Sequence, residues 1–65
     1  MMYKRLTGQP FGAVRIEGDQ AIRLNDGSIV QSYEDGFDTS GEPECYECVT
    51  RPDGRIEWYL VDFRV

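Results

Sequence analysis

Apolar and polar residues alternate with a period of two through most of the chain, and glycine, proline, asparagine and aspartate interrupt the alternation at short intervals. This pattern is typical of short β-strands joined by tight turns, because successive side chains of a strand point to opposite faces of a sheet. No stretch of ten or more residues shows the three-and-four spacing of an amphipathic helix. We therefore expect an all-β chain.

Six short strands are predicted, each bounded by residues that favour turns. Asn25-Asp26-Gly27 and Pro52-Asp53-Gly54 are strong hairpin signals, because glycine accepts a positive φ without a steric penalty. Gly18-Asp19 predicts another tight turn, which would make the runs on either side of it hairpin partners. The expected strands cover residues 2–6, 13–17, 20–24, 29–34, 44–50 and 55–65.

A length of 65 residues allows one small domain, 1–65, with a thin core. A flat sheet of six short strands would leave long edges and one face exposed. We therefore expect an antiparallel meander that closes into a small, partly open barrel of the SH3-like or OB-like type. The alternative is an open, strongly twisted sheet completed by a second copy. The predicted core consists of Leu6, Val14, Ile16, Ile22, Leu24, Ile29, Tyr33, Tyr46, Cys48, Ile56, Trp58 and Leu60.

The last predicted strand is apolar on both faces, whereas a strand of a half-solvated sheet alternates apolar with polar. In one interpretation, loops of the chain itself cover both faces. In the other, the face opposite Trp58 is an exposed patch that meets a partner protein or another copy, since such patches mark interaction sites. A two-fold homodimer through this strand or a free sheet edge is a separate expectation. The predicted patch consists of Tyr59, Val61 and Phe63.

Negative charge is concentrated in the second half of the chain. The net charge is -5, from 7 basic and 12 acidic residues; residues 1–33 carry four basic and three acidic groups, and residues 34–65 carry three basic and nine acidic groups. An acidic segment of this kind either steers a basic partner or mimics nucleic-acid phosphate, or it is a solvated loop. The acids predicted to bind a partner are Glu34, Asp35, Asp38 and Glu47.

The composition argues against several classes of protein. Histidine is absent, which excludes a Ser-His-Asp or Cys-His catalytic site within one chain. A chain this small has little volume for a water-excluding pocket, so we expect no enzymatic activity and no catalytic residues. The acidic segment lacks the ligand spacing of an EF-hand, and we expect no metal ion or cofactor.

Cys45-Tyr46-Glu47-Cys48 is a C-x-x-C motif in a segment that is predicted to be a strand. A redox motif of this type belongs at a helix start, where the helix dipole lowers the thiol pKa. In a strand, residues three apart point to opposite faces, and acidic neighbours raise a thiol pKa. Two ordinary structural cysteines are therefore expected, and a metal or redox role is the less favoured hypothesis.

Taken together, these features predict a non-enzymatic module that binds another protein through the aromatic strand and the acidic segment. An accessory subunit or a regulator, such as a phage or mobile-element inhibitor, would fit. We expect a cytoplasmic location, because two cysteines without a signal peptide suit a reducing compartment, and no apolar run reaches the length of a membrane span. The alternative is a nucleic-acid-binding barrel, which the net negative charge disfavours; its binding face would use Tyr3, Lys4, Arg5, Phe11, Arg15 and Arg23.

Overall fold

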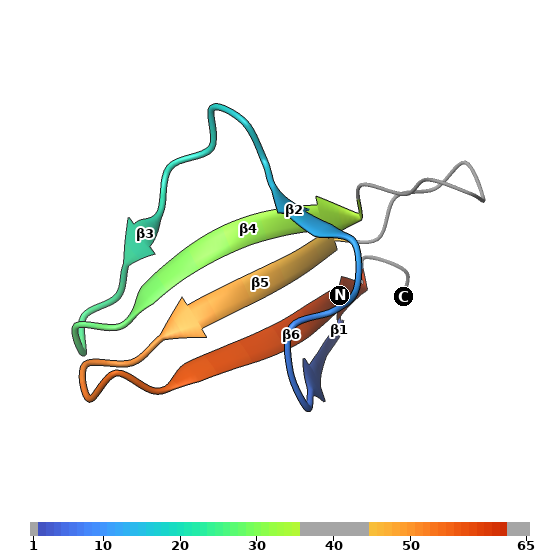
Figure 1. The fold of residues 1–65 in the computed structure, drawn as a ribbon. Helices are drawn as coiled ribbons and strands as arrows, with labels where there is room; N and C mark the ends of the chain where they lie inside the picture. The colour runs from blue at the N-terminus through green and yellow to red at the C-terminus, as the bar shows by residue number, and fades with distance from the viewer. Residues whose placement is uncertain (1, 36–44, 63–65) are drawn as a thin grey trace.

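A computed structural model describes residues 2–35 and 45–62, which form one six-stranded antiparallel sheet without a helix (Figure 1). The all-β class is confirmed. Asp38 and Phe63 lie outside the described residues, so the roles expected for them stay predictions. The strands are β1 (Met2–Leu6), β2 (Ala13–Arg15), β3 (Ile22–Arg23), β4 (Ile29–Asp35), β5 (Cys45–Thr50) and β6 (Ile56–Asp62).

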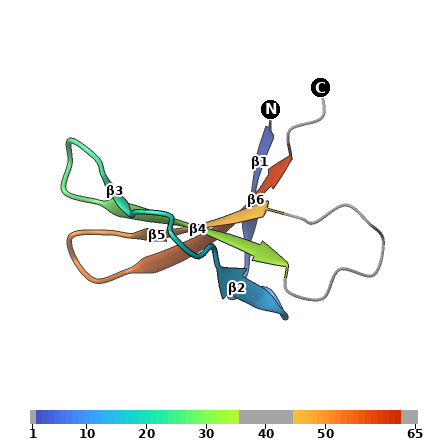
Figure 2. The ribbon, with the colours of Figure 1, turned by 90° about the horizontal axis from the view of Figure 1, so that it is seen from above.

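The strand order is β1-β6-β5-β4-β2, and β3 also pairs with β4. β3, β4, β5 and β6 form the expected meander, whereas β1 pairs with β6 rather than with its sequence neighbour β2. β1 and β2 lie at opposite ends of the strand order, so the sheet is not closed. Figure 2 shows the strong twist, with β1 running across the direction of the central strands. An SH3-like or OB-like barrel therefore stays a prediction.

β2 and β3 are not the hairpin partners that Gly18-Asp19 predicts. Both pair with β4 in the same direction, and between them the Ile16 N–H donates a hydrogen bond to the Ser32 carbonyl over 3.4 Å. Together they form one interrupted edge strand. Residues 17–21 bulge out of it, and Gly18 takes a φ of 81° within the bulge. Gly18-Asp19 does form a turn, but this turn belongs to a bulge at the sheet edge and does not reverse the chain direction.

Two hairpin turns of the same form lie side by side at one end of the sheet (Figure 1). In each, a glycine has a positive φ, 91° at Gly27 and 92° at Gly54. The aspartate before each glycine accepts a hydrogen bond from a backbone N–H two residues later, over 2.8 Å at Asp26 and 3.0 Å at Asp53. The turns also touch, because a Cβ placed on Gly27 would lie 3.4 Å from Cγ of Pro52. Both predicted turns are confirmed.

Strand register sorts the side chains onto two faces, because neighbours along a strand point to opposite sides. The face that holds Trp58 and Tyr46 is called the aromatic face here. The opposite face is called the acidic face, since Glu34, Glu47 and Glu57 all lie on it. Besides these three glutamates, the acidic face carries Tyr3, Arg5, Val14, Ile22, Val30, Ser32, Cys45, Val49, Tyr59 and Val61.

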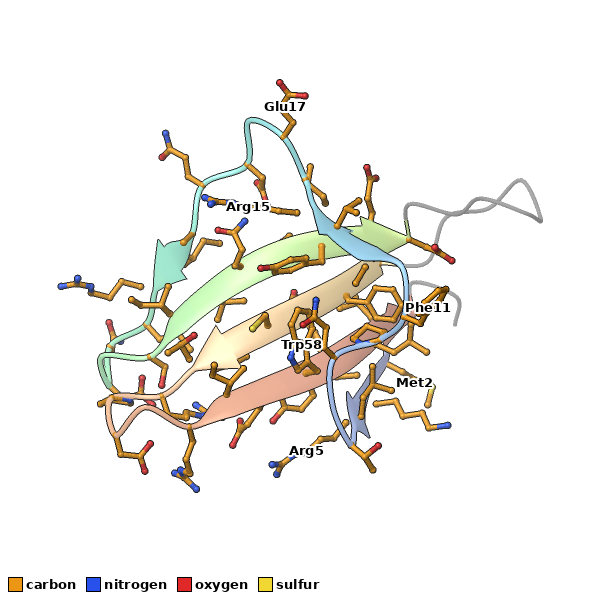
Figure 3. The ribbon with its side chains drawn as sticks, viewed as in Figure 1. Met2, Arg5, Phe11, Arg15, Glu17 and Trp58 are labelled. Carbon is orange, nitrogen blue, oxygen red and sulfur yellow. The ribbon has the colours of Figure 1, made fainter. Side chains whose placement is uncertain are left out.

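The core is divided between the two faces. Tyr46 and Trp58 are buried on the aromatic face, where the Trp58 ring meets Tyr33 edge-on at 4.8 Å between centroids. Val49 and Val61 are buried on the acidic face. The segment that joins β1 to β2 passes over the Trp58 side of the sheet (Figure 3).

Five residues of the predicted core are exposed, which corrects that prediction. They keep 37% to 62% of their surface accessible, because one layer of sheet with short edge strands supplies no second layer to cover them. The five are Val14, Ile22, Leu24, Ile29 and Ile56.

Candidate functional site

Four of the predicted partner-binding residues lie together on the acidic face. Glu47 on β5 is directly opposite Tyr59 on β6. Cys45 lies between Glu34 on β4 and Val61 on β6, so a continuous row crosses the three central strands. The sequence predicted an acidic segment and an aromatic strand as two separate features. The strand register shows that these four residues share one face.

Exposure on this face differs from the prediction made for the last strand. Val61 is only 6% exposed, so it contributes packing and almost no accessible surface, while Tyr59 is half-buried. The exposed apolar side chains of the row are at its two ends, namely Tyr3 at 53% and Val14 at 46%. Asp35 lies on the aromatic face, opposite to the face that carries Glu34 and Glu47.

At the end of the acidic face near the hairpin turns, Glu57 is 7% exposed and fully paired. Arg51 Nε donates a hydrogen bond to Oε1 of Glu57 over 2.9 Å, and the Tyr59 hydroxyl donates to the same oxygen over 3.0 Å. Arg51 Nη2 forms an ion pair with this oxygen at 2.8 Å. Arg5 Nη2 lies 3.8 Å from Oε2. These hydrogen bonds, the one from Arg51 first, lower the pKa of Glu57 and raise that of Arg51.

Arg51 also ties the two hairpin turns together. Its Nη1 donates to the hydroxyl of Ser28 over 3.2 Å and lies 3.7 Å from Oδ2 of Asp26. Ser28 is completely buried, and the bond from its backbone N–H to Asp26 is the main cause that lowers the pKa of this aspartate. We call Asp26, Ser28, Arg51 and Glu57 the paired end of the acidic face.

At the other end of the same face, Glu34 and Glu47 are half-buried, and neither has a hydrogen-bond or ion-pair partner within residues 2–35 and 45–62. Burial raises the pKa of Glu47. A half-open hollow of about 130 Å³ lies here. We call this region the unpaired end; the hollow is lined by Ile16, Ser32, Tyr33, Cys45, Tyr46, Glu47 and Val61.

The two cysteines lie on β5 as free thiols and, as expected for residues three apart in a strand, point to opposite faces. The pKa of Cys48 is raised by burial, and not by the acidic neighbours that the sequence analysis expected to raise a thiol pKa. Cys45 borders the hollow. The described part of the chain contains no group of three or more potential metal ligands.

Sequence reasoning missed the paired end. The spacing of Glu57 and Tyr59 places both on one face of a strand, which is a usable signal. The partnership with Arg51 was not predictable, because it depends on how the turn after β5 brings that residue back over β6, and on the packing of the two turns against each other.

The basic and aromatic residues of the alternative hypothesis divide between the faces. Lys4, Arg15 and Arg23 lie on the aromatic face, together with the 92% exposed Phe11 of the connecting segment (Figure 3). Tyr3 and Arg5, the remaining two, lie on the acidic face.

Comparison with models of known protein families, with curated proteins and with solved structures gave no match. Within the described residues, no helix has the length and apolar character that crossing a membrane requires. Function must therefore be argued from the chemistry of the two faces.

Proposed function

We propose that this chain is a small, non-enzymatic protein-binding module whose acidic face contacts a basic region of another protein. The observation that carries the proposal is the position of two carboxylates that have no partner among the described residues, Glu34 within an apolar row and Glu47 beside it, on one face of a single-layer sheet. Desolvating an unpartnered carboxylate destabilises the free chain, and a basic partner would relieve that effect.

The row supplies the apolar part of such a contact. It runs across the whole sheet from Val14 through Glu34, Cys45 and Val61 to Tyr3, with the exposed apolar side chains at both ends. Apolar and aromatic side chains provide most of the affinity of a protein interface, whereas charges set orientation and encounter rate. An accessory subunit or a regulator, such as an inhibitor used by a phage or mobile element, is a role that suits this small surface, and the two free thiols suit the cytoplasm.

Site-specific photo-crosslinking tests which face binds. The photoreactive amino acid p-benzoylphenylalanine would replace Tyr3, an exposed aromatic residue of the acidic face, and in a separate variant Phe11, an exposed residue on the other side. In cells that naturally express the chain, we expect a discrete adduct with one protein from position 3 and none from position 11. Adding Glu34→Gln and Glu47→Gln to the position-3 variant should reduce the adduct yield.

No adduct from position 3, or an equal adduct from position 11, would contradict the proposal. An adduct of twice the mass of the chain would replace it with self-association, which is the homodimer that the sequence suggests.

Nucleic-acid binding is the second candidate, because three basic side chains share the aromatic face with the exposed Phe11. Bases stack on exposed aromatic rings, and phosphates bind basic groups. Titration of labelled single-stranded DNA and RNA at 50 mM salt tests this candidate. Micromolar binding that weakens with added salt would support it, and absence of binding would remove it.

A further inference from the structure

The hollow at the unpaired end has the size of one side chain. Its volume of about 130 Å³ is well below the roughly 300 Å³ at which small-molecule sites begin. The residues whose side chains face it are Ile16, Ser32, Cys45, Glu47 and Val61, because Tyr33 and Tyr46 point to the opposite face. The hollow therefore combines apolar walls with one carboxylate and one hydroxyl, and it fits a single side chain of a larger partner.

Two carboxylates at and beside the hollow make it suited to a positively charged group. Glu47 lies on β5 in the middle of the sheet, opposite Ser32 on one side and Tyr59 on the other. Glu34 is its diagonal neighbour across β4 and β5, and such diagonal Cβ atoms are about 7–8 Å apart.

Within residues 2–35 and 45–62, both arginines on this side of the sheet are engaged elsewhere. Arg51 is bound to Glu57, Ser28 and Asp26, and Arg5 lies beside Glu57. The arginines of the described acidic face are thus held at the paired end, and the basic group of a partner protein can supply the cation for the hollow.

We propose that the hollow receives an arginine side chain of the partner protein, with its guanidinium group on Glu47 and its aliphatic stem along Ile16 and Val61. This inference rests on the proposed function and names the chemistry that the partner must present. Arginine is favoured over lysine because its planar group has five donors and can serve Glu47, the Ser32 hydroxyl and Glu34 together, and because it is less strongly hydrated than an ammonium group. The arginine stem is also suited to lie along apolar walls.

A titration followed by backbone amide NMR tests this assignment directly. The probe is the blocked tripeptide acetyl-Gly-Arg-Gly-amide, and its uncharged control contains citrulline in place of arginine. We expect saturable shifts, in the millimolar range for so small a ligand, at Ser32, Cys45, Glu47 and Val61. Glu47→Gln should weaken binding about tenfold, since a charge-assisted hydrogen bond is lost.

Glu17→Gln is the matched control variant. It makes the same chemical change and the same charge change on the exposed bulge, where Glu17 points away from the sheet (Figure 3), and it should bind the arginine probe like the original chain. The amide spectrum of each variant shows whether it is folded before the titration begins.

Four results would overturn the assignment: no saturable shift at the hollow, unchanged binding by Glu47→Gln, equal binding of the citrulline probe, or equal binding of the corresponding lysine probe. The titration uses the chain alone, so its outcome is independent of the photo-crosslinking experiment. A cross-link from position 3 without arginine binding would leave the protein-binding proposal standing and remove only this inference.

Discussion

The two ends of the acidic face contain similar residues and differ in how those residues are paired. At the paired end, Glu57 is nearly buried and is held by Arg51 and the Tyr59 hydroxyl, which lower its pKa. At the unpaired end, Glu47 is half-buried and has no hydrogen-bond or ion-pair partner among the described residues, and burial raises its pKa. The density of acidic residues in a sequence is therefore a poor guide to a binding site, whereas an acid left without its cation marks a place where a second molecule can add one.

The largest expected effect comes from breaking the paired end. Glu57→Gln removes the charge that binds Arg51 and leaves a guanidinium in a network built for a carboxylate. We expect the thermal midpoint to fall by about 10 °C, because the substitution breaks a partly buried ion pair and a small domain has a steep dependence of midpoint on stability. Circular dichroism during heating measures it. An unchanged midpoint would show that the ion pair between Glu57 and Arg51 does not contribute to the stability of the fold.

A second test concerns the turn contact that supports the paired end. Gly27→Ala should lower the free energy of unfolding by about 1–2 kcal/mol from its positive φ alone, with a further loss from the contact with Pro52. Gly54→Ala is the matched control, because its φ is almost the same and no atom lies within 4 Å of the added Cβ. Urea unfolding of both variants should give the larger loss at position 27; equal losses would mean that the contact between the turns is unimportant.

The same comparison shows how far the sequence predicts this molecule. The alternation predicts the all-β class, the two Asp-Gly turns and the sorting of Trp58 and Tyr59 onto opposite faces, because these features depend on local geometry. It does not predict that β2 and β3 share β4, or that β1 pairs with β6, since edge pairing depends on contacts between residues far apart in the chain.

For the site, the sequence supplies Glu34, Glu47, Tyr59 and Val61 as candidates. It cannot distinguish Glu47 from Glu57, because both are strand glutamates next to an aromatic residue. Only the register and the position of Arg51 show that Glu57 is paired with an arginine and that Glu47 has no such partner in the described part of the chain.

A smaller effect of opposite sign is expected at the unpaired end. Glu47→Gln replaces a partly desolvated carboxylate, which no described residue pairs, with a neutral group of the same shape. We expect the free energy of unfolding at pH 7 to rise by up to about 0.5 kcal/mol, the usual range for substitutions outside the core. Urea unfolding checks this. A loss of stability would mean that Glu47 makes a favourable interaction within the chain.

The smallest effect is a difference in the pH dependence of stability. The pKa of Glu57 is lowered by folding, so its contribution is present at neutral pH and is lost as the pH falls through its folded pKa. The pKa of Glu47 is raised, so its unfavourable contribution disappears as the pH falls through its folded pKa toward its unfolded value.

Stability of the original chain should therefore rise slightly on mild acidification and then fall at lower pH. Glu47→Gln should show only the fall. Unfolding midpoints in urea across the acidic range measure both curves, and identical curves for the two proteins would contradict the assignment of the rise to Glu47.

Site-specific titration of the glutamate side-chain carboxyl carbons by NMR tests the contrast between the two ends most directly. The paired and unpaired geometry predicts a pKa for Glu57 below the ordinary value of a glutamate and a pKa for Glu47 above it. A pKa for Glu47 at or below the ordinary value would show that the chain already supplies this carboxylate with a cation or a hydrogen-bond donor, and would contradict the account of the hollow as an open site for a partner.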